Sequence, residues 1–438
     1  MLTVRTPRSA RDCDGTTRRD FLRVGSLAVG GLSLPDLLRA RAQAATSASA
    51  PRRPTKDASV VLLWLGGGPT HIETFDPKTS APSEYRSAVG AVDTNVPGIQ
   101  LGGGFTNMAK VADKMAFVRS FAHKNSGHGG GTHFVMTGYD FAGADQGQKS
   151  IKPSYGAITA RYRGASNLET GMPTYVKLGG NGAEGAAFLG KTYAPFETGG
   201  QARANMNLTL AADRVNDRRS LLSRLDRLNR DVDVSGLMQG FDSFEQQAYG
   251  LILGGAKNAF DVRGESPKLR EQYGSGLGEQ MLQARRLCEA GCGFVTVTYG
   301  GWDMHGNVAS GMKTRGPTVD QAVSAFVEDC AERGLSEKVL LVVTGEFGRT
   351  PRINKNAGRD HWALLSTLAL AGGGLRMGQT VGESTAKAEV PKSTPIGPQD
   401  LMATLFHVLG LPRDLHYNDP AGRPVPMLDS GKPIAELI

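Results

Sequence analysis

Apolar runs that stop abruptly at polar, glycine-rich loops constrain the fold of this chain more than any other feature. A segment that is apolar at every position is typical of a strand buried on both faces, as in a parallel sheet. Three of these runs lead directly into glycines, which let the backbone turn sharply at a strand end. The expected strands are Ser59–Leu65, Met115–Arg119, Gly293–Tyr299, Val339–Thr344 and Leu364–Leu370.

Helical patterns lie between and after these strands. They are Asp217–Asn229, Phe241–Phe260, Gly278–Ala290, Val319–Arg333 and Pro398–Leu409. Helices that alternate with fully apolar strands predict an α/β fold, a three-layer sandwich around a central, mainly parallel sheet. The range 180–275 lacks strong strand signals, and we expect it to be a helical cap inserted into one domain that spans 58–438.

The N-terminal region has the pattern of an export signal. Arg18 and Arg19 precede a mild apolar stretch, Val24–Leu34, and Ala42–Ala44 has the small-x-small pattern of a cleavage site. We interpret 1–44 as a twin-arginine signal peptide and 45–57 as a flexible linker. Because a spanning helix needs roughly 20 apolar residues, no stable membrane span is expected. The expected location is the periplasm or the extracellular space, reached through the twin-arginine translocase.

The charge balance argues against nucleic acid as a partner. The chain has 50 Lys+Arg and 42 Asp+Glu, a net charge of +8, and half of this excess lies in residues 1–44. The rest of the chain therefore carries no basic stripe. Of the four cysteines, Cys13 lies in the leader, and the others are Cys288, Cys292 and Cys330. Cys288 and Cys292 are either a short-range disulfide or two small core side chains.

Histidines and carboxylates gather after the expected strands. In open parallel sheets, ligands bind beyond the carboxyl ends of the strands, and imidazole and carboxylate groups are the usual ligands of zinc and manganese. The sequence therefore predicts a polar, metal-capable site, whereas His407 and His416 are expected to be structural. The candidate side chains are His71, His123, His128, His133, Asp303, His305, Glu346 and His361.

Each of these candidates also has a structural interpretation. Asp303 and His305 would project to one side of an extended segment, or form an Asx turn with a stacked histidine. Glu346 follows a buried strand, where an ionised carboxylate needs a cation or hydrogen-bond donors. Arg349 is either its salt-bridge partner or a bidentate fork for an anionic substrate. Asp360–His361 supplies a ligand and its neighbour, or a helix cap and a packed histidine.

Five segments resemble a known bacterial family. They are GGGPTHIETFDPK (Gly66–Lys78), HKNSGHGGGTHFVMTG (His123–Gly138), WDMHGN (Trp302–Asn307), GEFGRTPRINKNAGRDHW (Gly345–Trp362) and GPQDLMATLFHVLGL (Gly397–Leu411). Together with the leader, they resemble the planctomycete-type domain-of-unknown-function family numbered 1501. That family belongs to the alkaline-phosphatase-like superfamily of phosphatases, phosphoglycerate mutases and sulfatases. The resemblance implies an alkaline-phosphatase-like sandwich for the whole mature chain and assigns no reaction to it.

The resemblance also implies one well-formed metal position. Asp303, His305 and His361 can fill the position that the superfamily builds from one Asp and two His. One carboxylate and two imidazoles suit a catalytic zinc with an open position for water. We expect one tightly held divalent ion, zinc, with manganese and calcium as alternatives.

A second metal position of the superfamily is incomplete in this chain. Gly67 and Phe347 stand where that position has two of its ligands, whereas Glu346 can replace a third. His71 or His128 is the further candidate ligand. Two ligands bind an ion much less tightly than three or four, so we expect this second position to be empty or to exchange readily.

The superfamily nucleophile has no clear counterpart. Its position falls on His128, with Ser126 as a nearby hydroxyl, and there is no Cys-x-Pro-x-Arg segment for a formylglycine sulfatase. The expected function is an exported metal-dependent hydrolase of phosphate or sulfate esters, acting on an anionic small molecule or glycan. Arg349 would hold the anion and His128 would be the general base or a ligand. The alternatives are a non-catalytic extracytoplasmic binding protein and acid–base or lyase chemistry on a sulfated glycan.

Overall fold

The computed structural model describes residues 57–167, 169–180, 183–197 and 255–438. The predicted signal peptide, nearly all of the linker and the predicted helix Asp217–Asn229 lie outside these residues. So does most of the predicted helix Phe241–Phe260, whose last part, Gly255–Phe260, is a 3-10 helix, η6.

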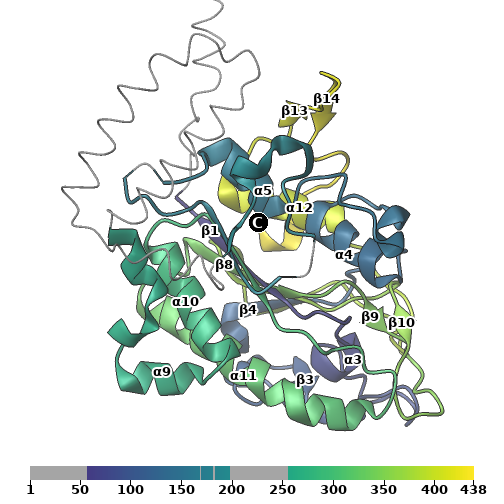
Figure 1. Ribbon diagram of the computed structural model, residues 1–438. Coiled ribbons are helices and arrows are strands. Elements are labelled where there is room, and N and C mark those ends of the chain that lie inside the picture. Colours follow the sequence, from purple (N-terminus) through teal and green to yellow (C-terminus); the bar gives the residue numbers. More distant parts are fainter. Residues whose placement is uncertain (1–56, 168, 181–182, 198–254) are drawn as a thin grey trace, which may run out of the picture. The chain divides into compact units, whose positions relative to one another are not determined.

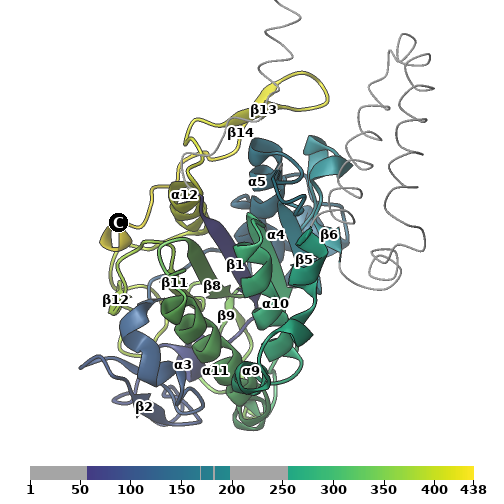
Figure 2. The same ribbon diagram turned by 90° about the vertical axis from the view of Figure 1, so that its left-hand side faces the viewer.

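An eight-stranded sheet forms the centre of the fold, in the order β12-β4-β11-β8-β1-β7-β5-β6 (Figures 1 and 2). All of its pairings are parallel except those of β11, which runs antiparallel to β8 and β4. The predicted α/β fold with a mainly parallel sheet is therefore confirmed. The strands are β1 (Ser59–Trp64), β4 (Met115–Val118), β5 (Tyr175–Leu178), β6 (Phe196–Glu197), β7 (Phe294–Thr298), β8 (Val339–Thr344), β11 (Leu368–Gly372) and β12 (Gln379–Val381).

Helices cover both faces of this sheet, because successive side chains of a strand point to opposite faces. Val61 and Leu63 of β1 belong to one apolar cluster, with side chains of α10 (Leu277–Glu289) and α11 (Val308–Glu332). Leu62 and Trp64 belong to the second cluster. The helices of that second face are α4 (His128–Thr137), α5 (Tyr155–Arg163) and α12 (Pro398–Leu409).

Two predicted helices agree closely with the structure and one is longer than predicted. α10 and α12 match Gly278–Ala290 and Pro398–Leu409 to within one residue at each end. α11 begins at Val308 rather than Val319, and Pro317 lies inside it. A proline removes one helical hydrogen bond, which is why the sequence indicated a later start.

The predicted strand Leu364–Leu370 was only partly right. β11 begins at Leu368, and Leu364 is 39% exposed. The two residues His361–Trp362, just before the predicted strand, form β10, which pairs with β9 (Gly348–Arg349) in a small antiparallel sheet of its own. This small sheet places His361 beside the segment that follows β8.

The range predicted as a cap contributes to the main sheet and to the face that α10 covers. β6 pairs with β5 at the sheet edge, and α9 (Pro267–Tyr273) packs against α10 and α11. Cys288, Cys292 and Cys330 are buried free thiols, so the reading of Cys288 and Cys292 as core side chains is correct. No helix among the described residues is both long and apolar enough to cross a membrane.

Candidate metal centre

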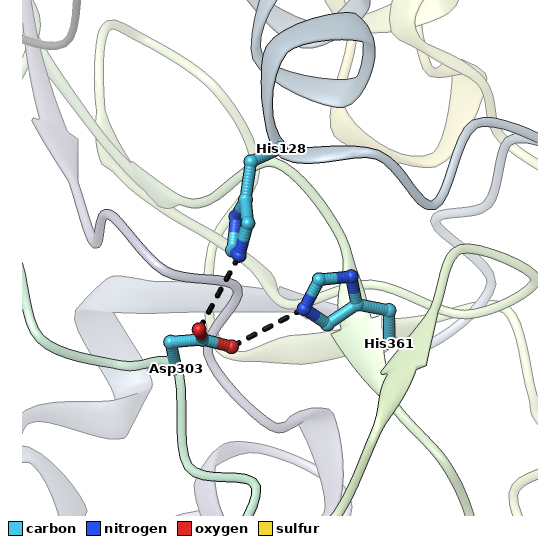
Figure 3. Close-up of side chains that lie close together, drawn as sticks. All are labelled: His128, Asp303 and His361. Atoms are coloured by element: carbon cyan, nitrogen blue, oxygen red, sulfur yellow. Dashed lines mark hydrogen bonds and ion pairs between the residues drawn. The ribbon is translucent and has the colours of Figure 1, made fainter. Parts of the chain in front are cut away.

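Three separate segments bring a carboxylate and three imidazoles together at the carboxyl end of the sheet. His128 is the first residue of α4, Asp303 and His305 lie in the loop after β7, and His361 begins β10. Figure 3 shows His128 and His361 pointing at the Asp303 carboxylate from two sides. The predicted convergence of these side chains is thus present.

The Asp303 carboxylate and two of the histidines form a compact triangle of possible ligand atoms. Asp303 Oδ1 lies 3.0 Å from His305 Nε2 and 3.2 Å from His361 Nε2, and these two nitrogens are 3.1 Å apart. In a tetrahedral zinc site with bonds of 2.0–2.2 Å, neighbouring ligand atoms lie roughly 3.4 Å apart. The three atoms therefore already have nearly the spacing of one face of such a site.

Hydrogen bonds to the other ring nitrogens orient both of these imidazoles. His305 Nδ1 lies 2.7 Å from Asp360 Oδ1, and His361 Nδ1 lies 2.9 Å from the Ser126 carbonyl oxygen. An ionised carboxylate and a carbonyl only accept, so each Nδ1 is placed to donate to its partner, and Nε2 of both rings faces the Asp303 carboxylate. Two ring nitrogens and a carboxylate oxygen thus face one another, and all three could bind one cation.

A second carboxylate orients His128 on the other side of Asp303. His128 Nδ1 lies 2.8 Å from Glu346 Oε1, which also accepts a 2.8 Å hydrogen bond from the Gly67 backbone N–H. His128 Nε2 lies 3.5 Å from Asp303 Oδ2. The hydrogen bond to Glu346 raises the pKa of His128, although partial burial opposes the shift. Because His128, Asp303 and His361 each place a ligand atom within 4.8 Å of the others, His128 can also bind an ion.

Glu346 is nearly inaccessible to solvent, with a side chain that is 3% exposed. Its Oε1 is shared by His128 and Gly67, whereas its Oε2 is buried without a hydrogen-bond partner. If Glu346 binds a metal as predicted, Oε2 is the oxygen that has no other partner. The contact with His128 that the structure shows is that of an orienting carboxylate.

Arg349 lies beneath the site and does not have the exposure that the predicted anion-binding role requires. Its side chain is 0% exposed, and its donors bond the backbone carbonyls of Gly68, Gly67 and Arg359 and, at 2.5 Å, Asp303 Oδ1. Partial burial alone would raise the pKa of Asp303, but the hydrogen bond and charge of Arg349 lower it to about 2. Arg349 thus keeps the Asp303 carboxylate ionised instead of facing a ligand.

Two other predicted site residues take different positions. The Ser126 hydroxyl accepts a 3.2 Å hydrogen bond from the Ala363 N–H, and its carbonyl orients His361, so its visible role is to position that ring. His71 is buried in the short helix α3 (His71–Thr74), with Nε2 3.1 Å from the Ala388 carbonyl. Burial lowers the pKa of His71 to about 4. None of its contacts reaches the Asp303 carboxylate, so the geometry favours a structural histidine over a second-site ligand.

The structure gives a physical reason for both gaps in the second metal position. Gly67 has φ +113°, and a Cβ on it would lie 2.6 Å from the Asp303 backbone nitrogen, so no side chain fits there. The ring of Phe347 is fully buried and packs against the imidazoles of His128 and His361, with centroids 5.1 and 4.4 Å away. An apolar ring thus occupies the space beside these histidines.

Sequence reasoning missed how Asp360 and Asn354 support the site. Asp360 was considered a ligand, yet it orients His305 from the side away from Asp303. The Asn354 amide donates to the His305 carbonyl at 3.0 Å and to both Asp360 oxygens at 3.2 Å. Nothing local in the sequence predicts these contacts, because His305 and Asp360 meet only in the folded chain.

Comparison with known proteins identifies the family of this chain. Residues 57–438 match the model of a family described as a protein of unknown function, DUF1501. The chain belongs to the DUF1501 family. No curated protein matches its sequence.

Solved structures similar to this DUF1501 protein are distant from it. PsFucS1 sulfatase from Pseudoalteromonas sp. is 13% identical over 87% of this chain and 72% of that one, with a TM-score of 0.40. Phosphonate monoester hydrolase SpPMH from Silicibacter pomeroyi is 12% identical, covering 82% and 74%, with a TM-score of 0.37. TAB5 alkaline phosphatase is 11% identical, covering 82% and 100%, with a TM-score of 0.35.

Proposed function

We propose that this DUF1501 protein is an exported, metal-dependent hydrolase of phosphate or sulfate esters. The observation that carries the proposal is the triangle of Asp303 Oδ1, His305 Nε2 and His361 Nε2, in which both rings turn Nε2 toward the carboxylate. Three protein ligands with a further position open to water or substrate are typical of catalytic zinc sites. A divalent ion held there would polarise an ester oxygen and make a water more acidic.

The donor set favours zinc among the expected metals. Two imidazole nitrogens and one carboxylate suit zinc and also manganese, whereas calcium prefers a shell of oxygen ligands. Asp303 brings its negative charge to the ion at neutral pH because Arg349 lowers its pKa to about 2. With an ion bound, the two orienting acceptors, Asp360 and the Ser126 carbonyl, would hold the imidazoles in the tautomer that binds metal.

His128 supplies the proton transfer in this proposal. Its Nδ1 is anchored by the buried Glu346 carboxylate, and its Nε2 lies on the Asp303 side of the ring. A side chain placed in this way can accept a proton from an attacking water or donate one to a leaving group. Arg349 has no direct contact with substrate in this scheme, since it is buried against Asp303.

A non-catalytic extracytoplasmic binding protein is the second candidate function. The observation that favours it is the filled second position, where Gly67 leaves no room for a side chain and the Phe347 ring packs against two histidines. In that case the protein would keep a pocket for an anionic ligand such as a sulfated or phosphorylated glycan, without turnover.

Elemental analysis and ester hydrolysis together test the proposal. We expect about one zinc or manganese ion per chain after gentle chelation, lost in His305→Ala and His361→Ala and kept in the control His416→Ala, whose side chain lies in an exposed strand. Aryl phosphate and aryl sulfate are the substrates for the assay. One ion without turnover of either ester, or no ion at all, would favour the binding protein.

The variant His128→Asn separates the two roles open to this side chain. Loss of a general acid or base lowers kcat by roughly 100- to 10,000-fold, with the ion retained. Loss of the ion together with activity would instead make His128 a ligand, as its distance to Asp303 and His361 permits.

A further inference from the structure

We infer that Arg359 and Glu73 are the positioning residues of the metal centre: a fully buried ion pair that holds the two ligand-bearing loops at the spacing an ion needs. This inference rests on the metal centre of the proposed function and is independent of which ester, if any, is hydrolysed. Neither residue touches the triangle of ligand atoms, so both would act through the backbone.

The two ligand-bearing loops are joined side by side along their backbones. The Arg359 N–H donates a 3.0 Å hydrogen bond to the Met304 carbonyl. Met304 lies between the ligands Asp303 and His305 on one loop, and Arg359 lies two residues before His361 on the other. Next to it, a Cβ on Gly358 would lie 2.1 Å from the His305 carbonyl carbon, so the two backbones are in direct contact. The contact continues through the hydrogen bonds Asn307 N–H to Asn356 O and Val308 N–H to Ala357 O, at 2.9 and 2.8 Å.

The Arg359 side chain anchors this contact in the protein interior. Its guanidinium is 0% exposed and lies 2.9–3.1 Å from Glu73 Oε1, on α3, which is also 0% exposed. Its Nη1 contacts the backbone carbonyls of Thr350 and Pro351, and its Nη2, shared with Glu73, contacts those of Tyr85 and Arg86. A planar fork with five donors can serve this many acceptors, which a lysine ammonium cannot.

Glu73 is equally well fixed. Its Oε1 also accepts from the Ala88 N–H at 3.1 Å, and its Oε2 accepts from the Thr70 hydroxyl at 2.5 Å. The pair therefore connects α3, the loop before β2 (Ala91–Asp93) and the segment after β9 to both ligand-bearing loops.

The Arg359 backbone also reaches the ligand Asp303 through a second buried arginine. The Arg359 carbonyl accepts from Arg349 Nη1 at 3.1 Å, and Arg349 Nη2 bonds Asp303 Oδ1 at 2.5 Å. A shift of the Arg359 backbone would thus move His361 directly. It would move Asp303 both through the hydrogen bond to Met304 and through Arg349. Outer contacts that orient metal ligands typically change metal affinity by roughly 10- to 100-fold when they are removed.

The test is Co²⁺ binding by the full-length protein, stripped of metal and titrated against a competing chelator. Removing one charge alone would leave its partner buried and unpaired, so the variant is Glu73→Gln with Arg359→Met, which removes both. The matched control is Arg285→Met with Asp329→Asn. That pair is also buried, with side chains 0% and 3% exposed, and joins α10 to α11 away from the site. Urea unfolding of the apo-proteins reports whether each variant is folded.

We expect Co²⁺ affinity to fall roughly 10- to 100-fold in the Glu73/Arg359 variant. In the control it should stay within about twofold, because well-separated sites act independently. Arg359→Lys, which keeps the charge and loses the fork, should recover only part of the affinity. An equal loss in both double variants, or no loss in either, would overturn the inference while leaving the metal centre in place. Wild-type protein that binds no Co²⁺ would overturn the metal centre and the inference together.

Discussion

Asp303 is the residue on which the whole site depends. Its Oδ1 faces His305, His361 and Arg349, and its Oδ2 faces His128. Because the hydrogen bond and charge of Arg349 outweigh partial burial, the pKa of Asp303 falls to about 2. The carboxylate is therefore charged at any pH at which the histidines are neutral enough to bind a metal.

The lowered pKa of the buried His71 makes the stability of the metal-free protein depend on pH. Burial lowers its pKa from the usual 6.5 to about 4, so the unfolded chain takes up a proton that the folded chain excludes. The free energy of unfolding should therefore fall as the pH drops from 6.5 to 4, by about 2 kcal/mol between pH 7 and pH 5 from His71 alone. Asp303 has the opposite shift, and its stabilisation is lost only as the pH falls from about 4 to 2.

Urea unfolding of chelated protein at pH 7 and pH 5 measures this effect. His71→Gln should lower stability at pH 7 and reduce the difference between the two pH values. The same variant should keep its metal, since His71 bonds the Ala388 carbonyl and no ligand atom. A variant that loses the ion at pH 7 would return His71 to the list of ligands.

At the scale of elements, the loop after β1 sets the floor of the site. Gly67 contacts the backbone of Trp302 and Asp303 and donates to Glu346, so it joins the ends of β1, β7 and β8. The glycine-rich end of β1 was predicted from sequence as a sharp turn. The three strand ends approach each other closely because β7, β1 and β8 are neighbours in the sheet.

Gly67→Ala should disrupt this junction. The new Cβ would lie 2.6 Å from the Asp303 nitrogen at a φ of +113°, so we expect a loss of about 3 kcal/mol or more and a displaced Asp303 with weak metal binding. Gly98→Ala is the control, because its φ of +83° is also positive but no atom lies within 4 Å of the added carbon. It should cost only about 1–2 kcal/mol. Equal unfolding energies and metal contents for the two variants would refute the crowding argument.

At the scale of the whole molecule, the twin-arginine signal peptide predicted for residues 1–44 leads to the proposal that the protein acts outside the cytoplasm. We predict that Arg18→Lys with Arg19→Lys retains the protein in the cytoplasm, because lysine does not reproduce the fork of a guanidinium. The control, Arg8→Lys with Arg11→Lys, makes the same change elsewhere in the leader. Cell fractionation measures both, and normal export of the Arg18/Arg19 variant would reject the twin-arginine assignment.

The sequence by itself determined the class of fold and pointed to the side chains that gather at the strand ends. Fully apolar strands such as Val339–Thr344 and amphipathic helices such as Pro398–Leu409 are local patterns, since burial on both faces or on one face selects the residues directly. Histidines and carboxylates at strand ends are equally local. That is why Asp303, His305 and His361 could be named as candidates before any contact was known, whereas their grouping as one metal position came from the family resemblance.

Only the tertiary structure decided which contacts each of these side chains makes. An anion-binding fork was one of the two roles predicted for Arg349. Its burial against Asp303 could not be predicted, because that burial depends on the order of β1, β7 and β8 in the sheet, which no local pattern encodes. The same holds for Asp360 behind His305 and for the Arg359–Glu73 pair, whose members lie far apart in the chain. Local composition decides where a strand or helix forms, whereas the roles of polar groups depend on long-range packing that brings distant segments within hydrogen-bond distance.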